Sequence, residues 1–570
     1  MMNAPAPQFF LTAYLCTAIA LLFATPIGHA QVVIPPQLDI SRQRAPQLPV
    51  PTDQPRFDLK LQSTEKSAVP KSADFIEFPV RQFDIQGVTA YPAERVAEIF
   101  APLAEGTSSL VKIREAAEQL ERVYRNDGFF LTRVFVPPQS IGDGTVRIQV
   151  IEGYVGDVQF ENLSAGLQQA VNARLHAVLE EKPVRLATLE DALMRINDLP
   201  SLSVQGVLKS GRELGASTLT VTRAELDDVQ LLTLNNQSST VTGPWNLGYS
   251  GQFKAPLTVL DTPHTLSVGV NGAGGGLSEV RSVNALISAP LGDSNWIAGL
   301  GGLWARAEPG GAAKPLDLVS QSSSLSARGR YALQRLRASS WFVDLGLTLN
   351  RTETTLSGIT LAADQTTVGE VGLSWLGQGP LGGNSAASVQ VYKGLDWFGA
   401  MDRSASNPSV IGFEPDFTKV VVNLQHTQPL AEQWSLHAQA LAQLSRDKLV
   451  AGEQVAFGGA NFAKGYDPST ILGDKGHGVA LELRRDVSSP VEWLKGLQLY
   501  GFVDMGQTTA LATPGTPESK SSLVSAGVGA RMAIGQAWSV NLFYAKGQRE
   551  RGVMTAVDED RIVLSLIHRF

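Results

Sequence analysis

In residues 497–504, LQLYGFVD, Leu497, Leu499, Gly501 and Val503 alternate with Gln498, Tyr500, Phe502 and Asp504. Successive side chains of an extended strand point to opposite faces, so Leu499 and Val503 share one face, and Gln498 and Asp504 share the other. The sequence at 266–271, LSVGVN, alternates in the same way. A strand with one apolar and one polar face is typical of the wall of a transmembrane β-barrel, which meets lipid outside and water inside.

The same texture extends from Asp227 to Phe570, where short alternating segments are separated by Gly, Pro, Ser, Asn and Asp. At roughly 20 residues per strand and loop, this region accommodates about 16 antiparallel strands, an even number as bacterial barrels require. A closed barrel is the one kind of sheet that leaves no unpaired backbone edge in a bilayer. A soluble propeller or solenoid would need a repeat of its own within this region, and residues 227–570 show none.

The chain ends on an alternating segment whose one face carries Ile562, Leu564, Leu566, His568 and the terminal Phe570. A terminal aromatic residue on such a strand resembles the assembly signal of outer-membrane barrels. The resemblance implies that Phe570 is read by the barrel-assembly machinery.

The composition excludes several functional classes. A net charge of -7 gives no basic surface for DNA or RNA, so no nucleic-acid partner is expected. Cys16 is the single cysteine, which excludes a disulfide scaffold and thiol catalysis. The seven histidines are scattered, and no zinc, phosphate-binding or hydrolase motif is present. We therefore expect no catalytic residues, no metal and no cofactor, and a protein that is not an enzyme.

The N-terminus predicts a secretory signal peptide, residues 1–30. An apolar core, 9–23, precedes Gly28 and Ala30, which suit cleavage between Ala30 and Gln31. The first eight residues lack Lys and Arg, so a retained membrane anchor is the alternative. Residues 31–75 are rich in proline, which indicates an extended linker, with a short helix at 38–44 and a plug segment in the pore left open.

Two consecutive units, 76–153 and 154–226, precede the barrel region, and both predict the element order β-α-α-β-β. In the first unit we expect a strand at 80–88, helices at 93–103 and 110–125, and strands at 130–136 and 145–151. In the second unit we expect a strand at 154–160, helices at 167–179 and 188–198, and strands at 202–209 and 217–222.

These paired units resemble POTRA domains, the modules that precede the barrel in outer-membrane assembly and secretion proteins. The resemblance implies that they bind an unfolded protein by offering a free sheet edge. The alternative is that they only hold the pore at a distance from the cell wall.

Residues 457–466, FGGANFAKGY, are similar to the V-R-G-Y or V-R-G-F loop motif of the same superfamily. Gly465 and Tyr466 match the motif, whereas Ala463 and Lys464 replace its Val and Arg. The resemblance implies a loop that folds back into the barrel. A lysine offers a point charge where arginine offers a planar fork, so we expect this loop to be held less tightly than in the family.

A later segment matches the F-x-D-x-G strand motif of the superfamily, with Phe502, Asp504 and Gly506 at the three fixed positions. The resemblance implies that Asp504 faces the lumen and pairs with Lys464. Asp344 lies in a segment of the same form, 342–346, but Asp504 follows the loop by one hairpin and is preferred. The alternative is that Lys464 is a solvated loop charge and Asp504 an ordinary pore-lining acid.

Two POTRA units before one barrel resemble the two-partner secretion transporters, the haemolysin/haemagglutinin secretion-activation family (TpsB type). The resemblance implies α+β POTRA repeats in the periplasm, a barrel in the outer membrane, and export of a large β-helical exoprotein of the TpsA type. Whether export also activates a haemolysin- or adhesin-type partner is left open by the resemblance. The implied partners are this exoprotein, outer-membrane lipid and the barrel-assembly machinery. The rivals are a barrel-assembly factor, which predicts more POTRA units, and a diffusion porin, which needs none.

Overall fold

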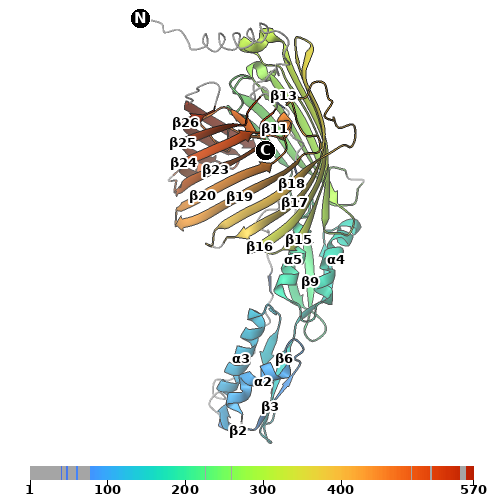
Figure 1. Cartoon of the computed structure of the whole chain (residues 1–570). Coiled ribbons are helices and arrows are strands. Elements are labelled where there is room, and N and C mark those ends of the chain that lie inside the picture. Colours follow the sequence, from blue (N-terminus) through green and yellow to red (C-terminus); the bar gives the residue numbers. More distant parts are fainter. Residues whose placement is uncertain are drawn as a thin grey trace.

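Two α/β domains follow one another below a closed β-barrel in the computed structural model (Figure 1). The structure describes residues 40, 47–48, 60–61, 77–104, 106–224, 226–257, 260–379, 381–489, 491–513, 516–552 and 560–570. The predicted signal peptide, with its cleavage site at Ala30 and Gln31, and the predicted helix at 38–44, apart from Ile40, lie outside the described residues. Within the described part of the chain, no helix combines the length and hydropathy needed to span a bilayer.

The barrel consists of 16 antiparallel strands, as predicted for residues 227–570. It closes because the last strand pairs with the first, from Leu231 opposite Arg569 to Asn235 opposite Ser565. The strands are β10 (Val229–Asn235), β11 (Asn246–Lys254), β12 (Thr265–Ala273), β13 (Val280–Pro290), β14 (Trp296–Ala307), β15 (Leu318–Arg335), β16 (Ser339–Leu356), β17 (Ile359–Gln378), β18 (Asn384–Leu395), β19 (Thr418–Ala431), β20 (Trp434–Ser445), β23 (Lys475–Val487), β24 (Leu494–Ala510), β25 (Ser519–Ile534), β26 (Trp538–Arg551) and β27 (Asp560–Arg569).

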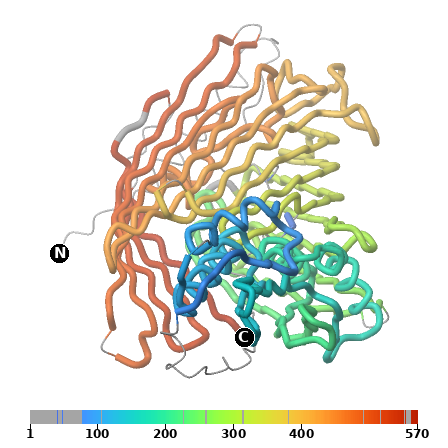
Figure 2. The backbone as a smooth tube through the Cα atoms, turned by 90° about the horizontal axis from the view of Figure 1, so that it is seen from below, coloured from blue at the N-terminus to red at the C-terminus, as the bar shows by residue number. Residues whose placement is uncertain are grey.

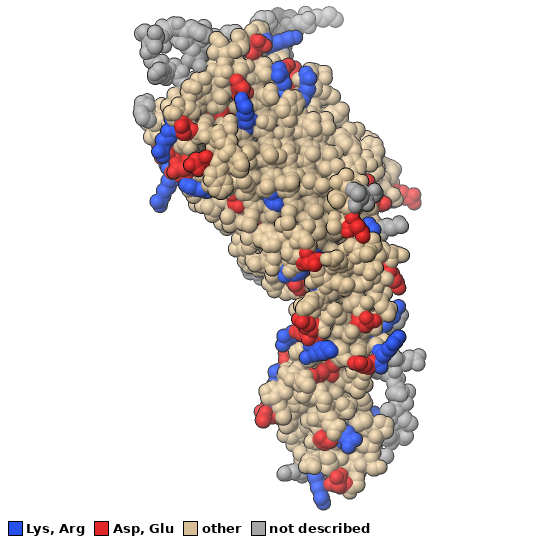
Figure 3. All heavy atoms as spheres, turned by 90° about the vertical axis from the view of Figure 1, so that its right-hand side faces the viewer, with Lys and Arg blue, Asp and Glu red and all other residues tan. Residues whose placement is uncertain are grey.

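The alternation that predicted the barrel also sets the two faces of its wall. On β24, Leu499 and Val503 are exposed on the outer face, whereas Phe502 and Asp504 are buried on the inner face. The middle of the barrel in Figure 3 is mostly free of Lys, Arg, Asp and Glu, which gather on the two domains and toward the top of the molecule. An apolar band of this kind is what a lipid bilayer requires.

Tryptophans mark the edge of this band on the side of the two domains. Five of the described tryptophans point outward from the barrel wall and lie near the strand ends that face the domains. They are Trp296, Trp341, Trp375, Trp434 and Trp538. Indole rings favour the interface between hydrocarbon and water, so these residues place one membrane surface at the rim that faces the domains. We call this rim the domain rim.

The first domain contains β2 (Glu77–Val80), β3 (Gln82–Gln86), α2 (Ala93–Phe100), β4 (Gly106–Ser109), α3 (Leu110–Asn126), β5 (Arg133–Phe135) and β6 (Thr145–Ile151). Both helices pack on a three-stranded sheet of order β3-β6-β5 around buried Ile113, Leu120 and Ile148. The prediction of one strand at 80–88 is wrong in detail. Val80 ends a strand that pairs with the unpredicted β4, and a second strand begins at Gln82.

The second domain repeats the plan with β7 (Tyr154–Glu161), α4 (Ala165–Glu180), α5 (Leu186–Asn197), β8 (Val204–Ser210) and β9 (Ala216–Arg223). All five predicted elements are present within a few residues of their predicted bounds. The sheet has a fourth strand, β1 (Lys60–Leu61), so its order is β1-β8-β9-β7. Lys60 lies opposite Val207 and Leu61 opposite Leu208, in parallel pairing. A piece of the predicted linker is therefore an edge strand of this domain.

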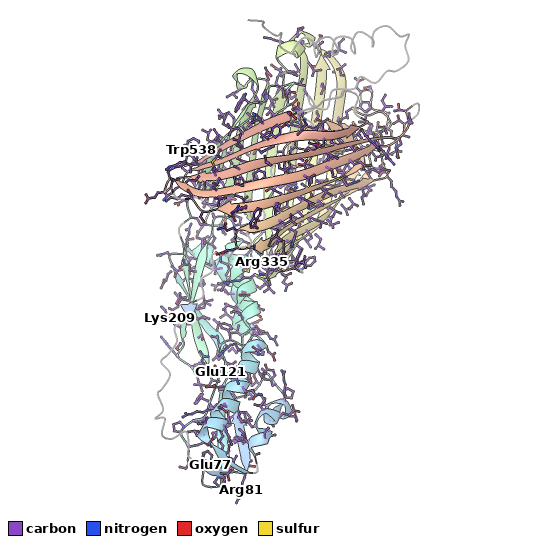
Figure 4. All side chains as sticks on the ribbon, turned by 90° about the vertical axis from the view of Figure 1, so that its left-hand side faces the viewer. Glu77, Arg81, Glu121, Lys209, Arg335 and Trp538 are labelled. Carbon is purple, nitrogen blue, oxygen red and sulfur yellow. The ribbon has the colours of Figure 1, made fainter. Side chains whose placement is uncertain are left out.

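Polar contacts join the second domain to the domain rim of the barrel. Arg335, at the end of β15, donates to both carboxylate oxygens of Asp198 at 2.7 and 2.9 Å, next to the end of α5. Arg174 of α4 donates to the carbonyl of Ser294 at 2.6 Å. Figure 4 shows Arg335 at this junction, and Figure 2 shows the second domain, in teal, beneath the green part of the barrel wall. The domain is thus fixed below one side of the pore.

The two described residues with buried side chains before β1 lie inside the barrel. Ile40 packs in a buried cluster with Leu303 and Ala305 on the inner face of β14. Leu48 lies beside Gly299 on the same strand, where a Cβ atom would come within 2.8 Å of its side chain. Because Gly299 is nearer the domain rim than Ala305, Leu48 lies closer to the domains than Ile40 does.

Candidate functional site: a loop locked inside the barrel

The connection between β20 and β23 folds back into the lumen. It contains a short antiparallel hairpin, β21 (Val455–Phe457) and β22 (Ile471–Gly473). Phe457, Phe462 and Tyr466 of this loop are buried in one cluster with Ala480 and Leu523, which face inward from the barrel wall. The loop is therefore part of a packed core inside the pore, as the motif resemblance implied.

The tip of the loop carries Lys464, whose ammonium group donates to Asp504 Oδ2 at 3.0 Å. The backbone N–H of Lys464 also points at the carboxylate, at 3.3 and 3.4 Å from its two oxygens. Ser525, opposite Asp504 on β25, donates to the same carboxylate. The Asp504 side chain is fully buried, and the Lys464 side chain is 14% exposed. A buried carboxylate with three donors is a well-satisfied anchor for a cationic loop.

An aromatic ring also packs against the ammonium group of Lys464. The Lys464 Nζ atom lies 4.4 Å from the centre of the Phe502 ring, the neighbour of Asp504 on the inner face of β24. A cation over an aromatic face gains electrostatic attraction beyond the ion pair. Phe502 and Asp504 thus hold the same side chain, and the structure brings both motif residues to the loop tip.

Two glycines make room for the loop against the wall. A Cβ atom on Gly465 would lie 2.6 Å from the backbone nitrogen of Gly547 on β26. A Cβ atom on Gly506 would lie 2.5 Å from the Phe457 side chain. A Cβ atom does not approach an atom to which it is not covalently bonded this closely. Both motif glycines are therefore needed for close approach of loop and strand.

The residues after the tip attach the loop to both ends of the barrel sheet. Tyr466 is buried, and its carbonyl accepts a hydrogen bond at 2.6 Å from Arg561 on the last strand, β27. Asp467 accepts from the Ser239 hydroxyl at 2.9 Å and from the Thr240 backbone N–H at 2.9 Å, both in the connection after the first strand. The loop therefore bridges the seam at which the barrel closes.

A second buried group holds the base of the loop. Asp474, just before β23, is fully buried and accepts hydrogen bonds from the backbone N–H groups of Leu449 at 2.9 Å and Leu511 at 2.7 Å. Lys419 and Glu453 form a buried ion pair of 2.8 Å nearby. The loop is thus fixed at its base as well as at its tip.

Asp344, the alternative partner, belongs to the opposite part of the wall. Its carboxylate accepts from Arg330 at 2.7 Å and from the Ser374 hydroxyl at 2.8 Å. The preference for Asp504 over Asp344 as the partner of Lys464 agrees with this geometry.

The sequence alone did not reveal Ser525, Asp467, Arg561 or Asp474. Ser525 and Arg561 lie on inward-facing positions of their strands, so alternation would have placed them in the lumen without naming their partners. Asp467 directly follows the loop motif, which is the one signal that could have found it. Phe570 is exposed, and its ring lies 4.6 Å from that of His568 at the domain rim. Its role as an assembly signal stays a prediction.

Residues 215–532 match the model of the "Haemolysin secretion/activation protein ShlB/FhaC/HecB" family, which is more than half of the chain. The chain belongs to this family. Residues 78–153, the first α/β domain, match the ShlB-type POTRA domain.

Named relatives and solved structures agree with the family. The chain is 23% identical over 405 residues to the haemolysin transporter HpmB of Proteus mirabilis, covering 70% of each chain. It is 26% identical over 430 residues to the haemolysin transporter ShlB of Serratia marcescens, covering 72% of each. The solved CdiB of Escherichia coli matches with a TM-score of 0.70 at 19% identity over all of both chains, which shows a common fold.

Family membership fixes the orientation of the molecule. Members of the ShlB/FhaC/HecB family are two-partner secretion transporters of the outer membrane, with POTRA domains in the periplasm. The domain rim of this barrel is therefore its periplasmic rim. The loop with Lys464 enters from the opposite, extracellular end, and its tip closes on Asp504 inside the lumen.

Proposed function

We propose that this transporter captures an unfolded exoprotein in the periplasm through its POTRA domains and passes it through the barrel to the cell surface. The named relatives are transporters of haemolysins, which suggests a large secreted protein of that kind as the passenger. Activation of the passenger during export belongs to the same proposal. Catalysis has no part in it.

The observation that carries the proposal is the strand β1 in the second POTRA domain. Lys60 and Leu61 add a parallel strand to β8, although they come from a segment far away in the chain. This sheet therefore accepts an extended peptide at its edge. At the opposite edge of the same sheet, the eight-residue β7 has no further partner strand among the described residues. Main-chain hydrogen bonds at such an edge bind peptides of many sequences, which suits an unfolded passenger.

The lumen suits the passage of a polar chain. Its wall carries ion pairs between inward-facing residues of strands two apart in the barrel, such as Arg328 of β15 with Glu370 of β17 at 3.1 Å and Arg531 of β25 with Glu482 of β23 at 2.7 Å. Charges that are already paired attract a passing peptide less than isolated charges would. The loop held by Lys464 fills part of the lumen, so export requires the loop or the wall to move.

Secretion of a large haemolysin-type exoprotein produced together with this chain tests the proposal. With the full-length transporter, the exoprotein is expected in the medium. A variant without residues 77–224 is expected to insert its barrel, seen as heat-modifiable migration in gels, but to leave the exoprotein in the periplasm. Secretion at the full rate by this variant would contradict recognition by the POTRA domains.

The same cells distinguish the two rivals. A barrel-assembly factor would leave the exoprotein unaffected and instead reduce the folding of other outer-membrane barrels when it is deleted. A diffusion porin would change only the uptake of small solutes. Either pattern without a secretion defect would overturn the proposed export.

A further inference from the structure

A groove runs across the outer, lipid-facing surface of the barrel between β20 and β27. Its volume is about 810 Å³, and its lining is almost entirely apolar. The outward-facing residues that line it are Trp434, Leu483, Arg485, Leu499, Gly501, Val528, Ala530, Leu542, Tyr544 and Ile562. The strands concerned are those of the front wall in Figure 4, where Trp538 is labelled.

The pairing register explains why this part of the wall is hollow. One row of neighbours across the sheet runs from Leu483 through Gly501 and Val528 to Tyr544. Gly501 lacks a side chain in the middle of this row, between large neighbours. A Cβ atom there would meet only the Gly527 carbonyl oxygen, at 3.9 Å, so the backbone does not require glycine. The space above Gly501 is open for another molecule.

Arg485 is the single cationic residue among the described residues that line the groove, and it lies at one end of the groove. The adjacent row runs from Trp434 through Arg485 and Leu499 to Ala530, and the Arg485 guanidinium lies 5.3 Å from the centre of the Trp434 ring. Within the described ranges, no carboxylate lies within ion-pair distance of Arg485. The outward-facing residues toward the middle of the membrane, Leu481 and Leu483, are apolar.

The position of Arg485 along the membrane normal indicates which part of a lipid its guanidinium contacts. Trp434 belongs to the tryptophans that mark the periplasmic membrane surface, so Arg485 lies where phospholipid headgroups begin. An arginine at this height extends its charge toward the interface and leaves its stem among acyl chains. Its planar group donates two parallel hydrogen bonds to a phosphate. The groove beside it, toward the middle of the membrane, offers an apolar surface to an acyl chain.

We propose that this groove is a binding site for one glycerophospholipid of the periplasmic leaflet, with the phosphate on Arg485 and an acyl chain over Gly501. An anionic headgroup, as in phosphatidylglycerol, is preferred. The ammonium of a phosphatidylethanolamine neutralises the headgroup and weakens its attraction to the guanidinium.

Native mass spectrometry of the full-length protein, exchanged from detergent into micelles with equal amounts of phosphatidylglycerol and phosphatidylethanolamine, tests the site. The wild type is expected to retain one phosphatidylglycerol. Arg485→Gln is expected to weaken this retention about fivefold. Arg446→Gln is the matched control, because Arg446 is an exposed arginine just beyond the opposite end of β20 and outside the groove.

Gly501→Leu provides an independent variant that keeps the charge and fills the groove. It is expected to lower phosphatidylglycerol retention as well, while heat-modifiable migration shows that the barrel is intact. Equal retention of the two lipids by the wild type, or retention unchanged in both Arg485→Gln and Gly501→Leu, would overturn the proposal. Equal losses in Arg485→Gln and Arg446→Gln would also overturn it, because they would indicate a general charge effect.

Discussion

The two halves of the ion pair in the lumen hold the loop unequally. Lys464 contributes one ammonium group, whereas Asp504 accepts from that ammonium, from the loop backbone and from Ser525. The pair is shielded from water in the lumen, because the Asp504 side chain is fully buried and the Lys464 side chain is 14% exposed. Loss of the aspartate therefore leaves more donors unsatisfied than loss of the lysine does.

Hydrogen exchange of residues 455–473 in the intact transporter measures how tightly the loop is docked. Lys464→Ala is expected to lower its protection by about 1–3 kcal/mol and Asp504→Ala by more. The double variant is expected to resemble Asp504→Ala, because both changes remove the same contact. Lys464→Arg is expected to keep the loop docked, because a guanidinium also pairs with the carboxylate and stacks on Phe502.

The controls for this cycle lie in the opposite wall. Asp344→Ala is expected to leave the protection of the loop unchanged, since Asp344 pairs with Arg330. Fully additive effects of Lys464→Ala and Asp504→Ala, or a stronger coupling of Lys464 with Asp344, would show that the ion pair does not lock the loop.

At the scale of elements, the turn between β6 and β7, which connects the two α/β domains, is bonded to the first domain through Glu152. Its carboxylate accepts from the backbone N–H groups of Thr89 at 2.8 Å and Ala90 at 2.9 Å, and from the buried Tyr124 hydroxyl at 2.6 Å. Burial opposes ionisation, but the hydrogen bonds from Thr89, Tyr124 and Ala90 outweigh it and lower the pKa of Glu152. The ionised form thus stabilises the first domain.

This pKa shift predicts an acid-sensitive first domain. A carboxyl group whose pKa is lower in the folded state contributes stability above its usual pKa of 4.5, and loses it as the pH falls through the folded-state value. Glu152→Gln is expected to reduce the exchange protection of residues 77–151 at pH 7 by about 1–3 kcal/mol. The variant is also expected to lose less stability than the wild type between pH 5 and pH 3.

Glu115→Gln is the matched control, because Glu115 is an exposed glutamate on α3 of the same domain. It is expected to leave the protection at pH 7 unchanged. Equal pH profiles for the wild type and Glu152→Gln would show that the Glu152 carboxylate does not hold this turn.

Elements with a strong periodic pattern could be predicted from the sequence. The 16 barrel strands follow from alternation, and α3 follows from Ile113, Leu120 and Tyr124 on one helical face. The loop lock could be predicted only through a family motif. No local pattern shows that Lys464 and Asp504, 40 residues apart, approach each other.

Elements that depend on distant partners could not be predicted. The polar sequence of β4, GTSS, has no alternation, and it is a strand because Ser108 lies opposite Phe78. Predicted strand 130–136 is shortened to Arg133–Phe135, because the backbone N–H groups of Phe129 and Thr132 bond within the preceding turn. The strand β1 exists through its pairing with β8 alone.

At the scale of the whole molecule, the described contacts run from the two α/β domains to the barrel and its inner wall. Glu152, in the turn between the two α/β domains, is bonded to the first domain, and Arg335 and Asp198 join the second domain to the barrel. Ile40 and Leu48 lie against the inner wall of the barrel. Outside the barrel, β1 pairs with β8 in the sheet of the second domain. The N-terminal segment thus touches the route that we propose for the passenger, from the sheet edge into the pore.

The central claim, passage of the exoprotein through the lumen, is tested most directly by disulfide trapping during secretion. Cys16 is the single cysteine of the chain, so Cys16→Ser gives a cysteine-free background. Gln390 faces the lumen on β18, and its neighbour Val391 is exposed on the outer face. The exoprotein carries one cysteine and is stalled in transit. A transporter with Gln390→Cys is expected to form a disulfide with this exoprotein, whereas a transporter with Val391→Cys is not. Equal trapping at both positions, or secretion without trapping at Gln390→Cys, would contradict export through the barrel.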